Sequence, residues 1–194
     1  MNIAVVSGSN RPKSGSRKTA DYIVEALANM GEQSQLFDLH EMNLPLWSQD
    51  MWDADSAQVS LWQEYKDKLK EADGLVIIAA EWNGTIPPSL HNFIMHLDRS
   101  TVGHKPVLIV GVSAGIGGTY PIAELKSSIN KNNRMVLIPD HVIVRHVNHD
   151  FDNDDHIVGP RIVESIKQLV LYAKHMGNLR QEMTFDYKQF GNGM

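Results

Sequence analysis

The sequence predicts an α/β protein built as a doubly wound, five-stranded parallel sheet, with helices on both faces in three layers. Apolar runs rich in β-branched residues alternate with longer segments of helical periodicity along the 194 residues. The apolar runs are continuous, which is typical of strands buried on both faces of a sheet. Strands that alternate with helices in this way pair in parallel through right-handed connections.

The expected elements follow one another in a regular order. Apolar runs at 2–7, 74–80 and 105–113 give three clear strands, and 33–39 and 142–147 are weaker candidates. Helices are expected at 16–30, 56–72, 88–97, 120–132 and 159–176, where apolar residues recur every three or four positions. Gly31 is a stop signal for the first helix, and Pro88 suits the first turn of the third.

No repeat, linker or second domain is visible, so these boundaries give one domain over residues 1–176. The remaining segment, 177–194, is a polar tail with scattered aromatic residues. We interpret this tail either as loosely ordered chain or as an arm exchanged with a partner subunit.

Composition excludes several classes of function. The net charge of −5 gives no electrostatic basis for binding nucleic acid. The chain has no cysteine, which removes thiol catalysis, disulfides and thiolate metal sites. No apolar run approaches the roughly 18 residues of a membrane helix, and no signal peptide is visible. We therefore expect a cytoplasmic protein without a membrane span.

No metal site is expected either. The nine histidines form no metal-binding pattern. The acidic stretch 150–155 lacks the glycine and the glutamate that a calcium loop requires at its sixth and twelfth places. We interpret this stretch as a solvated acidic turn.

The loop after the first strand has the composition of a phosphate site. It reads SGSNRPKSGSRKTA and offers the hydroxyls of Ser9, Ser14, Ser16 and Thr19 and the cations Arg11, Lys13, Arg17 and Lys18. It also opens a helix, whose N-terminus attracts anions. The dinucleotide and Walker fingerprints are absent, so a terminal phosphomonoester fits better than a pyrophosphate. The alternative is a polar loop in which Ser16 is the N-cap of the helix.

The loop after the third strand carries an exposed aromatic residue. It leaves the strand through Glu81, Trp82, Asn83 and Gly84, and the Asn-Gly pair predicts a tight turn. A tryptophan at a loop tip is costly to expose unless it is covered. A planar aromatic ligand, a partner subunit or the loop itself could cover Trp82.

The loop after the fourth strand contains a literal G-x-S-x-G, with Ser113 at its centre. This pattern is the nucleophile elbow of α/β-hydrolases, and acids and histidines that could complete a triad follow it. In an elbow, however, the helix begins directly after the serine, whereas here Gly115, Gly117 and Gly118 delay it. We therefore favour the interpretation that Ser113 lines a cofactor site, with hydrolysis as the weaker hypothesis.

Together these loops resemble the motifs of the NADPH-dependent FMN reductase family, which has a flavodoxin-like fold. The first motif is matched by Gly8-Ser9-Asn10-Arg11 with Ser14 and Ser16, the second by 80–92, and the third by 113–118. Three ordered motifs on three loops are specific, and the resemblance extends over about residues 1–175. The chain departs from the family at Trp82, where tyrosine is usual, at Ala80, where proline is usual, and at His91, where lysine is usual.

The resemblance implies a site for FMN. Ser9, Arg11, Ser14 and Ser16 would hold its phosphate. Glu81, Trp82, Asn83 and Gly84 would run along the isoalloxazine ring, and Ser113, Gly115 and Gly117 would line the other side.

The resemblance also implies an activity. A hydride would pass from NADPH or NADH through N5 of FMN to a small-molecule acceptor, such as flavin, a quinone, an azo dye or a chromate-like oxyanion, in ping-pong turnover. No catalytic side chain is expected, because the flavin carries the chemistry. A homodimer or homotetramer is expected. The alternative is a non-enzymatic electron-transfer or flavin-sensing module.

Overall fold

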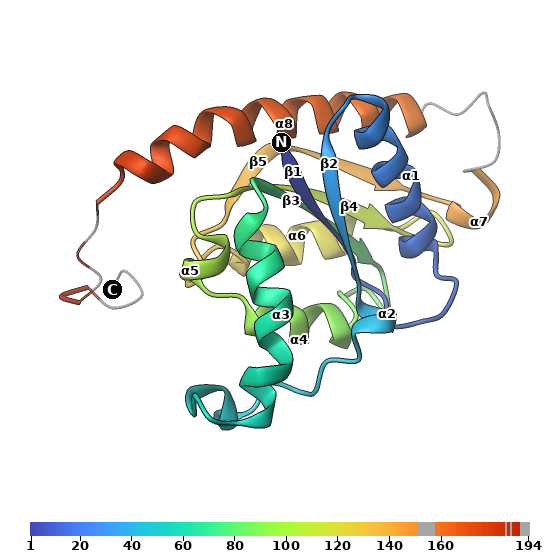
Figure 1. Cartoon of the computed structure of the whole chain (residues 1–194). Coiled ribbons are helices and arrows are strands. Elements are labelled where there is room, and N and C mark those ends of the chain that lie inside the picture. The colour runs from blue at the N-terminus through green and yellow to red at the C-terminus, as the bar shows by residue number, and fades with distance from the viewer. Residues whose placement is uncertain (151–157, 185, 187, 191–194) are drawn as a thin grey trace.

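Five parallel strands form the centre of the computed structural model, which describes residues 1–150, 158–184, 186 and 188–190 (Figure 1). The strands are β1 (Asn2–Ser7), β2 (Gln33–Asp38), β3 (Gly74–Ala80), β4 (Pro106–Val112) and β5 (Val136–Val144). Their order across the sheet is β2-β1-β3-β4-β5, and all four neighbouring pairs are parallel. The predicted doubly wound, flavodoxin-like α/β fold is confirmed.

Five longer helices cover the two faces of this sheet. They are α1 (Gly15–Asn29), α3 (Ala57–Glu71), α4 (Pro88–His96), α6 (Thr119–Ser128) and α8 (Val158–Glu182). Helices α1 and α8 pack on one face, and α3, α4 and α6 pack on the other, so there are three layers (Figure 1). The side chains of β1, β3 and β4 are buried almost without exception, which explains their continuous apolar sequences. None of the helices in the described part of the chain is long and apolar enough to cross a membrane.

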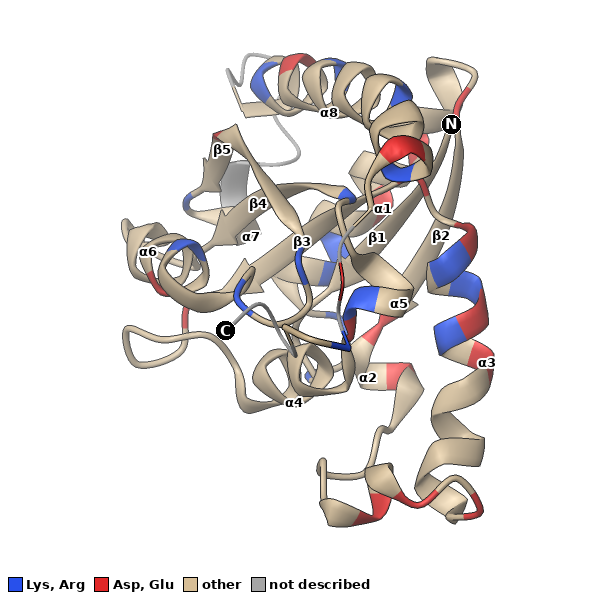
Figure 2. Cartoon of the chain, turned by 90° about the vertical axis from the view of Figure 1, so that its left-hand side faces the viewer, with Lys and Arg blue, Asp and Glu red and all other residues tan. Residues whose placement is uncertain are grey.

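Four short elements, α2 (Leu39–Met42), η1 (Gln49–Trp52), α5 (Arg99–Val102) and α7 (Val147–Asp150), were not expected from periodicity. Each is too short to show a helical repeat, since one turn contains 3.6 residues. The segment with η1 projects beyond the lower end of α3, and Figure 2 shows only acidic charges on it. Of the acidic stretch 150–155, residues 151–155 lie outside the described residues.

Two helices in the C-terminal half end at other residues than the sequence predicts. Helix α6 ends at Ser128, before the expected 132, while α8 continues beyond the expected 176 to Glu182. Gly177 therefore lies inside α8, and Arg180 in the added turn pairs with Asp73 at 3.8 Å. The division between a domain and a tail at residue 176 stays a prediction, and the tail residues 185, 187 and 191–194 lie outside the described part.

Strand β5 begins at Val136, well before the expected 142. Pro139, Asp140 and His141 interrupt its apolar pattern, and the pairing of β4 with β5 shifts register at this place. A bulge of this kind bends an edge strand and re-aims its side chains. Here it brings Asp140 to α8.

Asp140 is the centre of a polar cluster that joins β5 to α8. It accepts hydrogen bonds from both terminal nitrogens of Arg161, one of them at 2.8 Å, from Ser165 Oγ at 2.8 Å and from Gln168 Nε2 at 3.2 Å. The Arg161 guanidinium, aided by Ser165, lowers the pKa of Asp140 to about 2. The folded state therefore favours the ionised carboxylate.

Asp140→Asn should lower the free energy of unfolding by about 2 kcal/mol at pH 7. Because the pKa of Asp140 is depressed on folding, this stabilisation is complete above the pKa of about 3.9 expected for the unfolded chain and disappears as pH falls towards 2. Urea unfolding at pH 7 and at pH 3, with Glu164→Gln on the exposed face of α8 as the matched control, measures the difference. A deficit that is equal at both pH values would contradict this account.

Candidate functional site

The three candidate loops lie side by side at one edge of the sheet. They follow β1, β3 and β4, which are neighbours, and the carboxyl ends of parallel strands share an edge. The first loop is tied to β3, because the Gly8 N–H donates to the Ile78 carbonyl at 2.9 Å. The second is tied to β4, because the Glu81 N–H donates to the Val112 carbonyl at 2.8 Å. The three loops are therefore neighbours at this edge of the sheet.

In the first loop the N-cap of α1 is Ser14, not Ser16. The Ser14 hydroxyl accepts the Arg17 N–H at 3.1 Å. Ser16 is the second residue of the helix and is only 1% exposed. Its hydroxyl has no hydrogen-bond partner among the described residues. Ser9 is equally buried, and its hydroxyl accepts the Arg11 N–H at 3.3 Å. An unpartnered hydroxyl in the first turn of a helix is a feature that an anionic ligand would satisfy.

Three of the four cations of this loop fall into two groups. Arg17 binds three carboxylates, those of Asp21 at 2.9 Å, Asp38 at 2.7 Å and Glu41 at 3.1 Å. The hydrogen bonds that Arg17 donates to Asp38 and Asp21 raise its pKa above the usual value. The side chains of Arg11 and Lys13 are exposed and form no ion pair with the described residues. A ligand can therefore bind Arg11 and Lys13 without displacing a described carboxylate.

The second loop is a tight turn, as predicted. Trp82 and Thr85 exchange backbone hydrogen bonds of 2.9 and 3.0 Å. Asn83 and Gly84 between them have φ values of 51° and 75°. Two central residues with positive φ define the hairpin turn that Asn-Gly favours. Trp82 is half-buried rather than fully exposed.

The third loop does not have the geometry of a nucleophile elbow. The Ser113 hydroxyl accepts the Gly115 N–H at 3.1 Å, and its backbone is bonded to Val144 and Val147. No histidine ring bonds to Ser113 within the described residues, and α6 begins only at Thr119. The hydrolase hypothesis therefore has no support in the arrangement.

The side chain of Glu81 connects two of the three loops. Its carboxylate accepts the N–H of Gly118, the residue that precedes α6, and so joins the second loop to the third. On the other side of the turn, Glu124 of α6 accepts from Thr85 and Ile86. Sequence reasoning missed Glu124, because nothing local marks a helix glutamate that reaches a loop 38 residues earlier.

Two cavities extend the site towards the segment after β2. One of about 380 Å³ lies against the first loop, and another of about 480 Å³ lies beside the start of α4. Leu46, Pro88 and Asn92 line both. The first is also lined by Asn10, Leu39, His40, Asn43, Leu44 and Ser89, and the second by Trp47, Ile86, His91 and Met95. Apolar walls with a few polar groups are typical of small-molecule sites.

Known proteins are similar to this chain in sequence or in fold. The chain is 36% identical over 124 residues to a 2-hydroxy-1,4-benzoquinone reductase of a Burkholderia species, a match that covers 61% of the chain and 64% of that relative. A Pseudomonas putida quinone reductase is 32% identical over 122 residues, 60% of the chain and 62% of the relative. The chain thus spans less than two thirds of the length of these two relatives. The flavoenzyme NAD(P)H:(acceptor) oxidoreductase FerB of Paracoccus denitrificans has the same fold, with a TM-score of 0.75, 22% identity, and coverage of 90% of this chain and 98% of FerB.

A family model matches a longer part of the chain than these relatives do. The family model described as NADPH-dependent FMN reductase matches residues 1–149, which contain β1 to β5 and all three loops. The match covers well over half of the chain. The protein belongs to the NADPH-dependent FMN reductase family.

Proposed function

We propose that the protein is an NAD(P)H-dependent, FMN-binding reductase that transfers a hydride from NADPH or NADH to a small-molecule acceptor such as flavin, a quinone, an azo dye or a chromate-like oxyanion. The main observation in favour of the proposal is that the three loops with the family motifs follow adjacent strands of the sheet. FMN, when bound, supplies the hydride-transfer chemistry, so no catalytic side chain is required.

The first loop fits the phosphate of FMN. The unpartnered hydroxyl of buried Ser16 lies at the N-terminus of α1, where backbone N–H groups and the helix dipole favour an anion. Ser9 and Ser14 lie in the same loop, and Arg11 adds a positive charge that no described carboxylate neutralises. Ser9, Arg11, Ser14 and Ser16 would therefore hold the phosphate.

The second and third loops would hold the ring system. The backbone of Glu81, Trp82, Asn83 and Gly84 would run along one side of the ring, and Ser113, Gly115 and Gly117 would line the other. The N–H groups of Gly115 and Gly118 are already bonded within the protein. Those of Ile116 and Gly117 find no acceptor among the described residues, so they could donate to a polar ring edge and stabilise negative charge there.

Turnover with NADPH tests the proposal against a non-enzymatic flavin module. Purified protein with added FMN should oxidise NADPH or NADH in steady state when a quinone or free flavin is present. Stoichiometric binding of FMN without turnover on any of these acceptors would contradict the proposed reductase activity. The protein would then be an electron-transfer or flavin-sensing module. Because NAD(P)H is an intracellular reductant, the proposal also places the protein in the cytoplasm.

We further propose that the protein is a homodimer or homotetramer in which a second copy covers the apolar residues beside the cavities. Leu46 is 78% exposed, Trp52 76% and Met95 49%. Trp47 and Trp52 stack edge to face with ring centroids 5.5 Å apart. Exposed apolar residues in contact with one another are typical of protein interfaces.

Trp52→Glu should convert the assembly to monomers, because it places a charge among these apolar side chains. Sedimentation analysis of the wild-type protein and the variant measures the effect. Leu171→Glu, at an exposed position of α8, is the control for an added surface charge. A monomeric wild-type protein would contradict the proposal.

A further inference from the structure

Two glutamates fasten the turn of the second loop to helix α6, in the sense that their carboxylates accept hydrogen bonds across the junction. Glu81 lies directly before the turn, and Glu124 lies in the second half of α6. Both side chains are half-buried, and both accept hydrogen bonds from groups on the other side of the junction. Neither is explained by the chemistry of hydride transfer, since both bond to the protein itself.

Glu81 fastens the beginning of the turn. Its carboxylate accepts the N–H of Gly118, the N-cap residue of α6, which has no side-chain cap of its own. The carboxylate therefore caps α6 from another loop, where the helix dipole favours a negative charge. A Cβ at Gly117 would lie 2.7 Å from Glu81 Oε1, so glycine is needed there for the carboxylate to approach.

Glu124 fastens the end of the turn. A single oxygen, Oε2, accepts the Thr85 hydroxyl at 2.7 Å and the Ile86 N–H at 2.9 Å. Thr85 also closes the turn by its backbone hydrogen bonds to Trp82. The turn is thus fixed at both ends to residues 118–124 and is held as one unit with α6.

We propose that Glu81 and Glu124 are positioning residues that hold the Trp82–Thr85 turn where the flavin ring binds and so set the affinity for the ring. The proposal rests on the proposed function, because it takes the ligand to be a flavin. A turn that is already fixed loses little conformational freedom on binding, whereas a loose turn would have to be ordered by the ligand. Because the fastening acts on the turn and not on the first loop, it affects the ring and leaves the phosphate contribution unchanged.

Binding of FMN and of riboflavin, measured by flavin fluorescence, tests the proposal. Riboflavin lacks the phosphate, so the ratio of the two dissociation constants reports the phosphate contribution alone. Glu81→Ala and Glu124→Ala should each weaken both ligands about tenfold, as expected for a lost hydrogen bond to a charged group, with the ratio unchanged. Glu81→Gln and Glu124→Gln keep an accepting oxygen and should restore binding to within about threefold of wild type.

Amide hydrogen exchange in the free protein gives a second readout that does not involve the flavin. Glu124→Ala should speed exchange at Ile86, and Glu81→Ala should speed exchange at Gly118, while the amides of β3 and β4 stay protected and show that the variants fold. Glu164→Ala, which removes an exposed carboxylate from α8 on the opposite face of the sheet, is the matched control.

The outcomes separate the two proposals. If wild-type protein binds flavin and the alanine variants bind it equally well, the positioning role is wrong and the proposed function stands. Unchanged exchange at Ile86 and Gly118 would also overturn it. If wild-type protein binds neither flavin, the proposed function itself fails.

Discussion

Gly8→Ala is expected to destabilise the protein by about 3 kcal/mol, because the new methyl group has no space. A Cβ at position 8 would lie 2.4 Å from the Ile78 carbonyl oxygen and 2.9 Å from Leu90 Cδ2. The Ile78 carbonyl belongs to the central strand β3 and accepts the Gly8 N–H. It therefore cannot move away without breaking this hydrogen bond between β3 and the first loop. The first loop must shift instead.

The same shift should weaken FMN binding at least tenfold, since it displaces Ser9 and Arg11 from the phosphate position. Denaturant unfolding and flavin titration measure the two effects. Gly115→Ala is the control for unfolding, because a Cβ there meets no atom within 4 Å. A Gly8→Ala protein with wild-type stability would show that the loop can relax, which would contradict the close approach described here.

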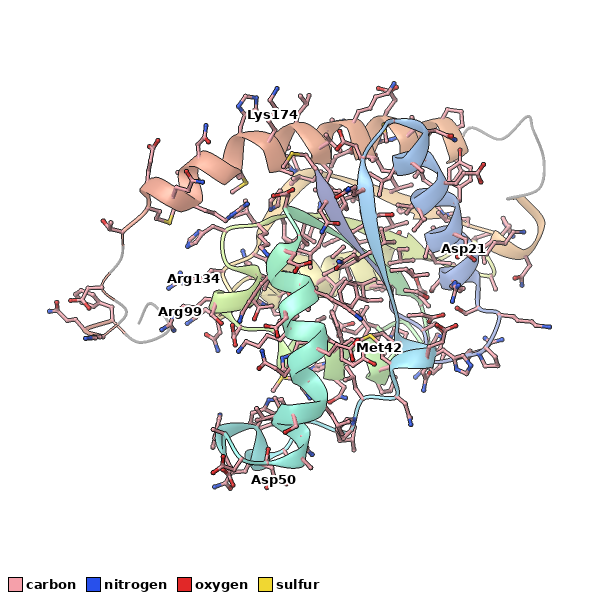
Figure 3. The ribbon with its side chains drawn as sticks, in the orientation of Figure 1. Asp21, Met42, Asp50, Arg99, Arg134 and Lys174 are labelled. Atoms are coloured by element: carbon pink, nitrogen blue, oxygen red, sulfur yellow. The ribbon has the colours of Figure 1, made fainter. Side chains whose placement is uncertain are left out.

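Arg11→Ala should weaken FMN binding about thirtyfold while the affinity for riboflavin stays unchanged. Arg11 is a cation of the first loop that is not paired with a described carboxylate, so its removal costs a charge-assisted contact to the phosphate and no internal ion pair. Fluorescence titration with both ligands measures the difference. Lys174→Ala, which removes a charge pointing away from the sheet on α8, is the control (Figure 3).

An equal loss for FMN and riboflavin would mean that Arg11 acts through the shape of the loop and not through the phosphate. That result would move the phosphate site away from the first loop. Salt dependence gives a further check, because a contact between a guanidinium and an exposed phosphate weakens at high ionic strength.

The sequence predicts most accurately the strands that are buried on both faces along their whole length. Strands β1, β3 and β4 are buried on both faces, so their apolar runs are continuous and easy to recognise. Edge strand β5 is different, because Asp140 turns to meet Arg161 and interrupts the pattern with polar residues. The sequence places the end of α8 too early, because the segment that follows residue 176 is polar. The helix continues to Glu182, and Arg180 in its last turn bonds to Asp73.

Within the site, the loops were predictable and the contacts between them were not. The order of strands brings the three motifs together, and the Asn83-Gly84 turn follows from local preference. The sequence offers Arg17 as a candidate cation for the phosphate, but Asp38, 21 residues later in the chain, binds it. Local pattern likewise gives no sign that Glu81 and Glu124 accept bonds from distant residues, because such pairings arise only from tertiary packing.

The binding of FMN is the claim on which the function, the ring position and the role of the two glutamates depend. The visible absorption spectrum of the purified protein, recorded before and after addition of FMN and removal of excess ligand, tests it most directly. We predict flavin bands that remain with the protein at about one FMN per chain and differ in shape from those of free FMN. A protein that retains no flavin and leaves the spectrum of added FMN unchanged would contradict the account.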